Sequence, residues 1–224
     1  MRIRTLLKEN SPKIPSDAYA YYPFNGDTLD YSGNGRDIVS TNKVTVNSDH
    51  VLPYDTYSYL KTPIQIVNGM TDTTTSVSFY WDGVLYIDTR KNRAAFGITT
   101  LLTSDWVRNS FVIQINSSTT GDIYISGYIN DGWAVGIPQL SIGVHNITIT
   151  KSSNTFKCYL DGELYNTLLF TGNLAVNSSQ TLHIGNRSNN GNGFDQGFRG
   201  PIYGFVHYKR VLSDDEIKVL AESL

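Results

Sequence analysis

The sequence has almost no cysteine and no long apolar run, and both shortages narrow the class of protein. Cys158 is the only cysteine among 224 residues, which excludes an intrachain disulfide and a thiolate-rich metal site. No run approaches the ~20 apolar residues of a membrane-spanning helix, so no membrane span is predicted. Residues 1–10 lack the apolar core of about 7–15 residues that a secretory signal contains. This and the free thiol favour synthesis in the cytosol without a signal peptide.

Charge is also scarce, because charged residues make up 17% of the chain and the net charge is −2. Nucleic acid is therefore not expected as a partner, since phosphate binding needs a concentrated basic face. Only four of the acidic residues are Glu, and no strand carries the pair of closely spaced carboxyl groups that glycoside hydrolysis needs. No Gly-x-Ser-x-Gly elbow or phosphate-binding glycine motif is present. The sequence therefore predicts a protein that is not an enzyme.

Tyrosine, glycine and asparagine are abundant, with 15, 19 and 19 copies, a composition typical of strands and tight turns. About ten short strand-like segments follow one another, and Cys158 alternates with Phe156 and Leu160 in one of them, which predicts a core position for the thiol. Four Asn-Gly or Asp-Gly pairs mark turns between such segments, at 25–26, 82–83, 131–132 and 161–162. The pattern predicts an all-β fold with antiparallel strands, a sandwich or a barrel.

Two further segments differ from this β pattern. Residues 213–224 predict a short C-terminal helix, because Ser213 and Glu216 are spaced as a capping box. Residues 1–17 are predicted to form an N-terminal docking arm that binds a protein partner or packs along the domain, with residues 18–224 as one domain. The arm residues expected to dock are Arg2, Arg4, Leu6 and Leu7.

Motifs at both ends of the globular region resemble the laminin-G-like, concanavalin A-like lectin-glucanase domains. Residues 20–35 resemble the opening aromatic strand and the Asp-x-Ser-Gly-Asn-Gly loop of that family. Residues 145–162 resemble its hairpin ending in Tyr-x-Asp-Gly, and residues 184–217 follow its closing pattern. The resemblance implies an antiparallel jelly-roll β-sandwich. It says little about the ligand, since this fold carries lectins, adhesion domains and virion parts.

A calcium site is one expectation, because many relatives hold calcium near the equivalent of the loop at 25–34. Calcium prefers about six to eight oxygen ligands, and the candidate ligands are Asn25, Asp27 and Asp30. The alternative is that these residues are there only to make turns. One departure from the family pattern weakens the prediction of a calcium site. The family often has Asp-Glu where this chain has Tyr203 and Gly204.

Carbohydrate binding is a second expectation, because exposed aromatic rings stack on sugars and neighbouring polar groups bind their hydroxyls. The alternative is that tyrosines simply cover a sheet surface. An aromatic loop with Tyr54, Tyr57 and Tyr59 is one candidate. The other candidate residues are Tyr128, Asn130, Asp131, Trp133, Arg187, Asn190 and Phe194.

Two functions are compatible with these features. The first is a non-catalytic adhesion or decoration protein, an accessory component of a larger particle such as a phage virion head or tail appendage, held by residues 1–17. It would then lie on a virion or at the outer surface of a particle. The second is a free carbohydrate-binding lectin module that binds surface glycans, with or without calcium. A homo-oligomer fits either function.

Overall fold

A computed structural model gives the structure of the chain. The residues that it describes are 14–55, 57–64, 72–84, 97–103, 111–117, 122–127, 136–137, 140–153, 155–169, 181–186 and 197–224.

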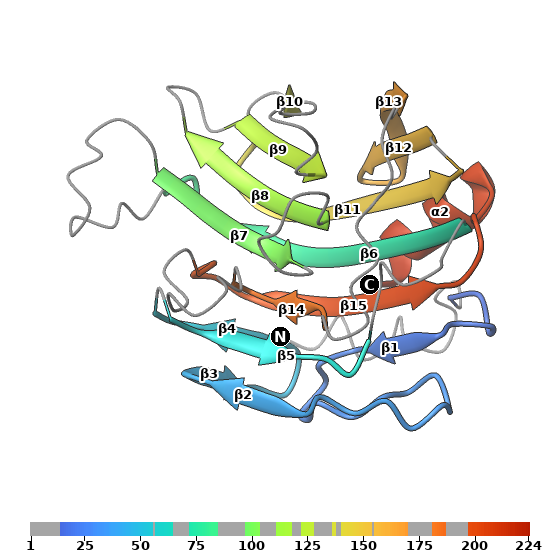
Figure 1. Ribbon diagram of the computed structural model, residues 1–224. Helices are drawn as coiled ribbons and strands as arrows, with labels where there is room; N and C mark the ends of the chain where they lie inside the picture. The colour runs from blue at the N-terminus through green and yellow to red at the C-terminus, as the bar shows by residue number, and fades with distance from the viewer. Residues whose placement is uncertain are drawn as a thin grey trace.

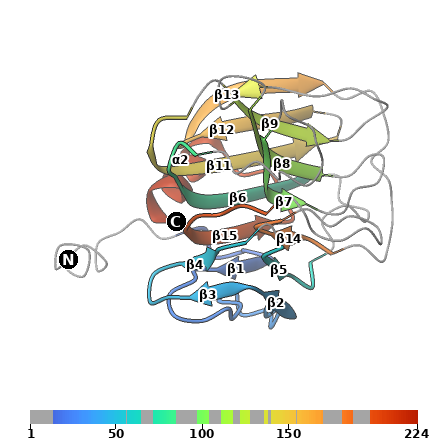
Figure 2. The ribbon, with the colours of Figure 1, turned by 90° about the vertical axis from the view of Figure 1, so that its left-hand side faces the viewer.

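The described strands form two antiparallel sheets, which Figure 2 shows as two layers side by side. The eight-stranded sheet contains, in spatial order, β13 (Glu163–Leu169), β12 (Thr155–Leu160), β11 (Gly143–Ser152), β6 (Asp72–Trp81), β15 (Ile202–Tyr208), β4 (Val51–Pro53) and β3 (Val44–Val46), with β1 (Ala20–Tyr22) also paired to β15. The seven-stranded sheet contains β10 (Gly136–Ile137), β9 (Asp122–Gly127), β8 (Phe111–Ser117), β7 (Gly97–Thr103), β14 (His183–Ile184), β5 (Tyr59–Lys61) and β2 (Ser40–Asn42).

The core follows from the two-residue period of the long central strands. On β6, Val77 and Phe79 belong to the main apolar cluster, while Ser76 and Ser78, which alternate with them, point to the opposite face. On that opposite face, Asn146 of the neighbouring β11 donates to Ser76 Oγ at 3.0 Å. The polar side chains there are buried and hydrogen-bonded to one another, as buried polar groups must be.

The C-terminal helix α2 (Asp214–Ser223) covers part of the outer face of the eight-stranded sheet (Figure 2). Its buried Ile217 and Leu220 form a second apolar cluster, with Tyr159, Val206 and Tyr208 as further members. The predicted capping box is confirmed: Ser213 is the N-cap, and both of its reciprocal hydrogen bonds with Glu216 are present.

The turn between β12 and β13 illustrates how local sequence sets the sheet. Asp161 and Gly162 have φ values of 50° and 85°, the left-handed conformations that a two-residue hairpin turn of type I′ requires. The predicted hairpin is therefore confirmed, and so is the core position of Cys158, which is buried. The antiparallel sandwich with one short C-terminal helix agrees with the fold class that the sequence predicts.

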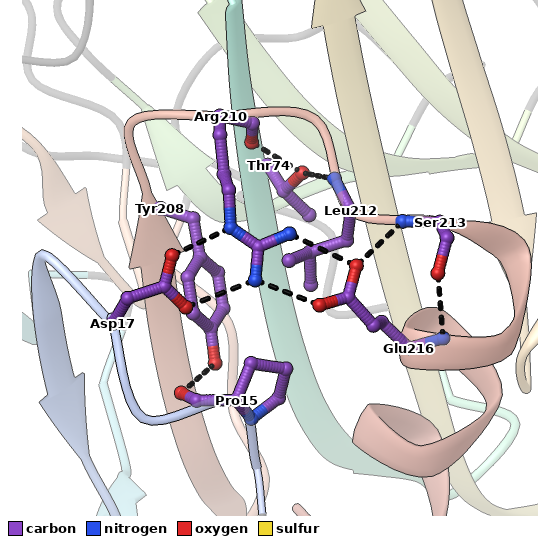
Figure 3. Close-up of polar contacts among 8 residues, drawn as sticks. All are labelled: Pro15, Asp17, Thr74, Tyr208, Arg210, Leu212, Ser213 and Glu216. Carbon is purple, nitrogen blue, oxygen red and sulfur yellow. Dashed lines mark hydrogen bonds and ion pairs between the residues drawn. The ribbon is translucent and has the colours of Figure 1, made fainter.

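Polar contacts next to α2 attach the segment before β1 to the sandwich, and we call Pro15, Asp17, Tyr208, Arg210 and Glu216 the clamp (Figure 3). Arg210 forms ion pairs with both Asp17 and Glu216, at 2.6 and 2.7 Å. The Tyr208 hydroxyl donates to the backbone carbonyl of Pro15 at 3.0 Å. Residues 14–17 thus contact the sandwich, and the predicted boundary between arm and domain at residue 17 stays a prediction. No helix in the described part of the chain is long and apolar enough to cross a membrane.

Candidate functional site

The aromatic loop between β4 and β5 is the one predicted sugar-binding feature that the described residues contain. Tyr54 is 57% exposed, whereas Tyr57 and Tyr59 are half-buried. An exposed ring beside partly buried ones can offer an apolar face to a ligand without a large rearrangement of the loop.

Hydrogen bonds to one buried serine hold this loop in place. Ser58 Oγ accepts from the backbone N–H groups of Tyr54 and Asp55, at 3.2 and 2.9 Å. The same hydroxyl donates to the carbonyl of Lys43 at 2.7 Å. The Asp55 carboxylate also accepts from the backbone N–H of Tyr57 at 2.9 Å, which is an Asx-turn. The backbone N–H groups of Tyr54, Asp55 and Tyr57 are therefore held by hydrogen bonds, which lowers the entropic cost of binding.

A charged pair adjoins the rings, and sequence reasoning missed it. Lys43 Nζ lies 2.6 Å from Asp55 Oδ2 and 5.2 Å from the centroid of the Tyr57 ring. The pair offers an ammonium and a carboxylate for sugar hydroxyls beside an apolar surface. The Asp-x-Tyr spacing at 55–57 could have indicated the Asx-turn, but the approach of Lys43 depends on the pairing of β3 with β4.

The predicted loop at 187–196 lies outside the described residues, but Asn186, which directly precedes it, contacts the aromatic loop. Asn186 donates from Nδ2 to the carbonyl of Ser58 at 2.8 Å. The backbone N–H of Phe198 bonds the carbonyl of Gly185 at 2.8 Å. The remaining predicted binding residues also lie outside the described part of the chain: Arg2, Arg4, Leu6, Leu7, Tyr128, Asn130, Asp131, Trp133, Arg187, Asn190 and Phe194.

In the loop predicted to bind calcium, Asp30 organises the backbone. Its two carboxylate oxygens accept four hydrogen bonds of 2.9 to 3.0 Å, from the backbone N–H groups of Tyr21, Ser32 and Arg36 and from the Ser32 hydroxyl. Partial burial alone would raise the pKa of Asp30, but these hydrogen bonds outweigh burial and lower the pKa below its usual range.

These contacts bear on whether the loop suits a metal ion. A carboxylate has about four acceptor directions, and the protein already occupies four at Asp30, so in this arrangement Asn25, Asp27 and Asp30 fit calcium poorly. Asp27 likewise accepts from the backbone N–H of Leu29 and from the hydroxyl of Tyr31, both at 3.0 Å. The described residues contain no group of three or more His, Cys, Asp or Glu that could hold a metal ion. Calcium binding stays a prediction.

One further cluster has the residue types of a nucleophile triad. His145 Nδ1 lies 2.8 Å from Asp161 Oδ2, and its Nε2 lies 3.4 Å from Ser141 Oγ. Nε2 is also 2.8 Å from the Ser141 carbonyl oxygen. That oxygen can only accept, so Nε2 donates its proton there and is not available as a base for the hydroxyl. The contacts fix the start of β11 against the β12–β13 turn.

The two facing antiparallel sheets and the fixed loops at their edges define a lectin-like β-sandwich. Residues 54–218, more than half of the chain, match the family model of the concanavalin A-like lectin/glucanases superfamily. The chain belongs to this superfamily, as its motifs indicated. No curated protein sequence is significantly similar to the chain.

Solved structures with the same fold come from several proteins. Trypanosoma rangeli sialidase, solved with 2,3-difluorosialic acid, has a TM-score of 0.69 at 11% identity, over 97% of this chain and 35% of the sialidase. Domain 4 of AbnA, a GH43 extracellular arabinanase from Geobacillus stearothermophilus solved with arabinotriose, has a TM-score of 0.65 at 15% identity, over 92% and 98% of the two chains. The botulinum neurotoxin type G receptor-binding domain has a TM-score of 0.64 at 14% identity, over 92% and 51%. Such identities show a shared fold alone, and this chain spans about a third of the sialidase.

Proposed function

We propose that the protein is a non-catalytic binding domain that recognises a glycan through the aromatic loop at Tyr54–Tyr59. The observation that carries this proposal is the exposed Tyr54 ring on a loop held by Ser58, beside the Lys43–Asp55 pair. A sugar ring would stack on Tyr54, and its hydroxyls would bond the ammonium and the carboxylate. Domain 4 of the arabinanase, a sandwich of the same fold solved with arabinotriose, is consistent with this role.

Three of the described carboxylates are engaged by other groups of the chain, which supports binding rather than hydrolysis at these residues. Glu216 is paired with Arg210 and belongs to the cap of α2, and Glu163 is paired with Lys218. Asp30 is saturated with donors from its own loop. Two carboxyl groups at hydrolytic spacing in a shared cleft would be needed for glycosidase chemistry, and each of these three groups has a partner of its own instead.

The test is a glycan array with the full chain, run in calcium and then in chelator. Any glycan that binds is then titrated against Tyr54→Ala, which we expect to weaken binding about tenfold because it removes the stacking ring. Tyr165→Ala is the matched control, since Tyr165 is exposed on β13, at the opposite edge of the eight-stranded sheet from β3 and β4. Loss of binding in chelator would add calcium to the proposal. An array without binding, or unchanged binding by Tyr54→Ala, would refute the proposed site.

A second candidate function keeps the same sandwich as an accessory part of a larger particle, such as a phage virion, held by residues 1–17. The contacts of Arg210 with Asp17 and of Tyr208 with Pro15 support this function. They attach the end of the arm to β15 and to the segment before α2, so a partner bound to the arm would be held firmly to the sandwich. Deletion of residues 1–13 would then abolish attachment to the particle, or self-assembly of the chain, without unfolding the sandwich. Normal assembly of the truncated chain with every partner would count against this function.

A further inference from the structure

The ring of Tyr19, just before β1, is contacted by two cationic side chains. The guanidinium carbon of Arg36 lies 3.7 Å from the ring centroid, and Lys209 Nζ lies 3.8 Å from it. Lys209 directly follows β15, which pairs with β1 (Figure 1), and Arg36 belongs to the loop that Asp30 fixes. Three separate segments, one of them at the other end of the chain, thus bring two positive charges to one phenol.

Neither charge is neutralised by an ion pair in the part of the chain that the structure describes, where the paired cations are others. Lys43 gives the contrast: it also lies over a tyrosine ring, that of Tyr57, but it is paired with Asp55 at 2.6 Å. Two like charges held close together without a counter-ion repel each other. A bound anion would therefore lower the electrostatic free energy of the two cations.

The carboxylates nearest in sequence to Arg36 serve the backbone of their own loop. Asp30 Oδ2 accepts from the backbone N–H of Arg36, and Asp37 Oδ1 accepts from the backbone N–H of Asp30. The guanidinium of Arg36 itself donates from Nη1 to the Tyr19 carbonyl at 3.1 Å. This bond fixes the side chain and leaves further N–H groups of its planar fork for a ligand.

The two cations make the electrostatic potential at the Tyr19 hydroxyl positive. Partial burial alone would raise the pKa of Tyr19, but hydrogen bonding and charge from Lys209 and Arg36 outweigh burial and lower the pKa below its usual range. His207, whose ring packs edge-on against Tyr19 at 6.0 Å, adds no charge, because burial and the nearby Lys209 lower its pKa to about 3. Tyr19 is half-buried and Lys209 is exposed, so a solute can reach the cluster.

We propose that Tyr19, Arg36 and Lys209 form a binding site for an oxyanion, namely a sulfate or phosphate group. The guanidinium fork suits the paired oxygens of such a group, Lys209 contributes a second cation, and the Tyr19 hydroxyl can donate a third hydrogen bond. The site is independent of the aromatic loop, because β15 joins β4 through Ile202 and joins β1 through His207 near its other end.

The test follows the 13C resonance of the Tyr19 ring carbon that bears the hydroxyl, in the full chain, assigned with Tyr19→Phe. Sodium sulfate and sodium phosphate are titrated against sodium chloride at equal ionic strength. We expect saturable shifts with the oxyanions only. Lys209→Gln is expected to weaken binding about tenfold or more, because a charge-assisted hydrogen bond is lost. Lys218→Gln, on α2 and paired with Glu163, is the matched control and is expected to leave binding unchanged.

Arg36→Gln gives a second, independent variant, although it also removes the bond to the Tyr19 carbonyl. A sulfated monosaccharide and its neutral parent then separate the two sources of the anion. Tighter binding of the sulfated sugar than of free sulfate assigns the site to a saccharide-borne group, and equal binding assigns it to the free ion. The proposal is overturned if folded wild-type protein gives no saturable shift, or if binding persists in both Lys209→Gln and Arg36→Gln.

Discussion

Arg210 Nε donates to Asp17 Oδ2 at 2.6 Å, and the two residues are 193 positions apart in the chain. A second nitrogen of the same guanidinium donates to the other Asp17 oxygen at 2.9 Å. Two more hydrogen bonds run from the guanidinium to Glu216. One side chain thus joins the entry of the chain to the first turn of its last helix.

Removal of this guanidinium should destabilise the fold. Arg210→Gln is expected to lower the free energy of unfolding by about 1–2 kcal/mol, since the network is bidentate but its side chains are a third to a half exposed. Lys218→Gln breaks the more exposed pair with Glu163 and should cost less than about 0.5 kcal/mol. Urea denaturation measures both changes. An equal cost for the two variants would show that Arg210 contributes no more than an ordinary surface pair.

The same clamp should make stability depend on acidic pH. The hydrogen bonds from Arg210 lower the pKa of Glu216 from 4.5 to about 2, and Arg210 also lowers the pKa of Asp17. A carboxylate with a lowered pKa in the folded state stabilises the fold fully above its unfolded pKa and loses that contribution as the pH falls. The loss should therefore run from about pH 4.5 towards about pH 2.

Glu216→Gln isolates this effect, because glutamine can still cap α2 but does not titrate. The stability advantage of the wild type over this variant should be about 1 kcal/mol near neutral pH, after allowance for solvent screening. It should shrink as the pH is lowered through the stated range. Chemical denaturation at a series of pH values gives the difference directly. A constant difference down to about pH 2 would mean that Glu216 does not carry the pH dependence.

Gly162 should tolerate no side chain. Its φ is +85°, and a Cβ there would lie 3.2 Å from Lys218 Cα of α2, so Gly162→Ala combines backbone strain with a clash against a helix backbone. We expect a loss of about 2 kcal/mol or more. Gly33→Ala is the matched control, because φ is +82° there but no atom lies within 4 Å. It should cost only about 1 kcal/mol, and similar values for the two variants would exclude the clash.

Asp30 should contribute more than Asp27 to the free energy of unfolding. Asp30→Ala leaves partly buried backbone donors of Tyr21, Ser32 and Arg36 without their acceptor, for an expected cost of about 2–4 kcal/mol in urea denaturation. Asp27→Ala removes bonds that are exposed to water and should cost less than about 1 kcal/mol. A small effect at Asp30 would contradict its role as the acceptor that organises the loop.

Much of the fold could be predicted because its rules are local. The capping box at Ser213 and Glu216 and the hairpin turn at Asp161 and Gly162 depend on residues at most three positions apart. The burial of Cys158 follows from the two-residue period of one strand. Family motifs at both ends then selected the sandwich among antiparallel folds.

Less of the candidate sites than of the fold could be predicted from the sequence. Tyr54, Tyr57 and Tyr59 could be named from their spacing, and Asn25, Asp27 and Asp30 from their oxygens. The occupation of Asp30 by four donors could not, because one of them, Tyr21, lies nine positions away on β1. Most of the other predicted binding residues lie outside the described part of the chain.

The sequence by itself determined many of the strand segments, the hairpin turn at 161–162 and the cap, since each depends on the conformational preferences of a few neighbouring residues. Only the tertiary structure decided which charges meet: Lys43 with Asp55, Arg210 with Asp17, and Arg36 with Lys209 around Tyr19. Charges attract or repel through space and not along the chain. Their partners were therefore fixed only when antiparallel pairing brought distant strands together.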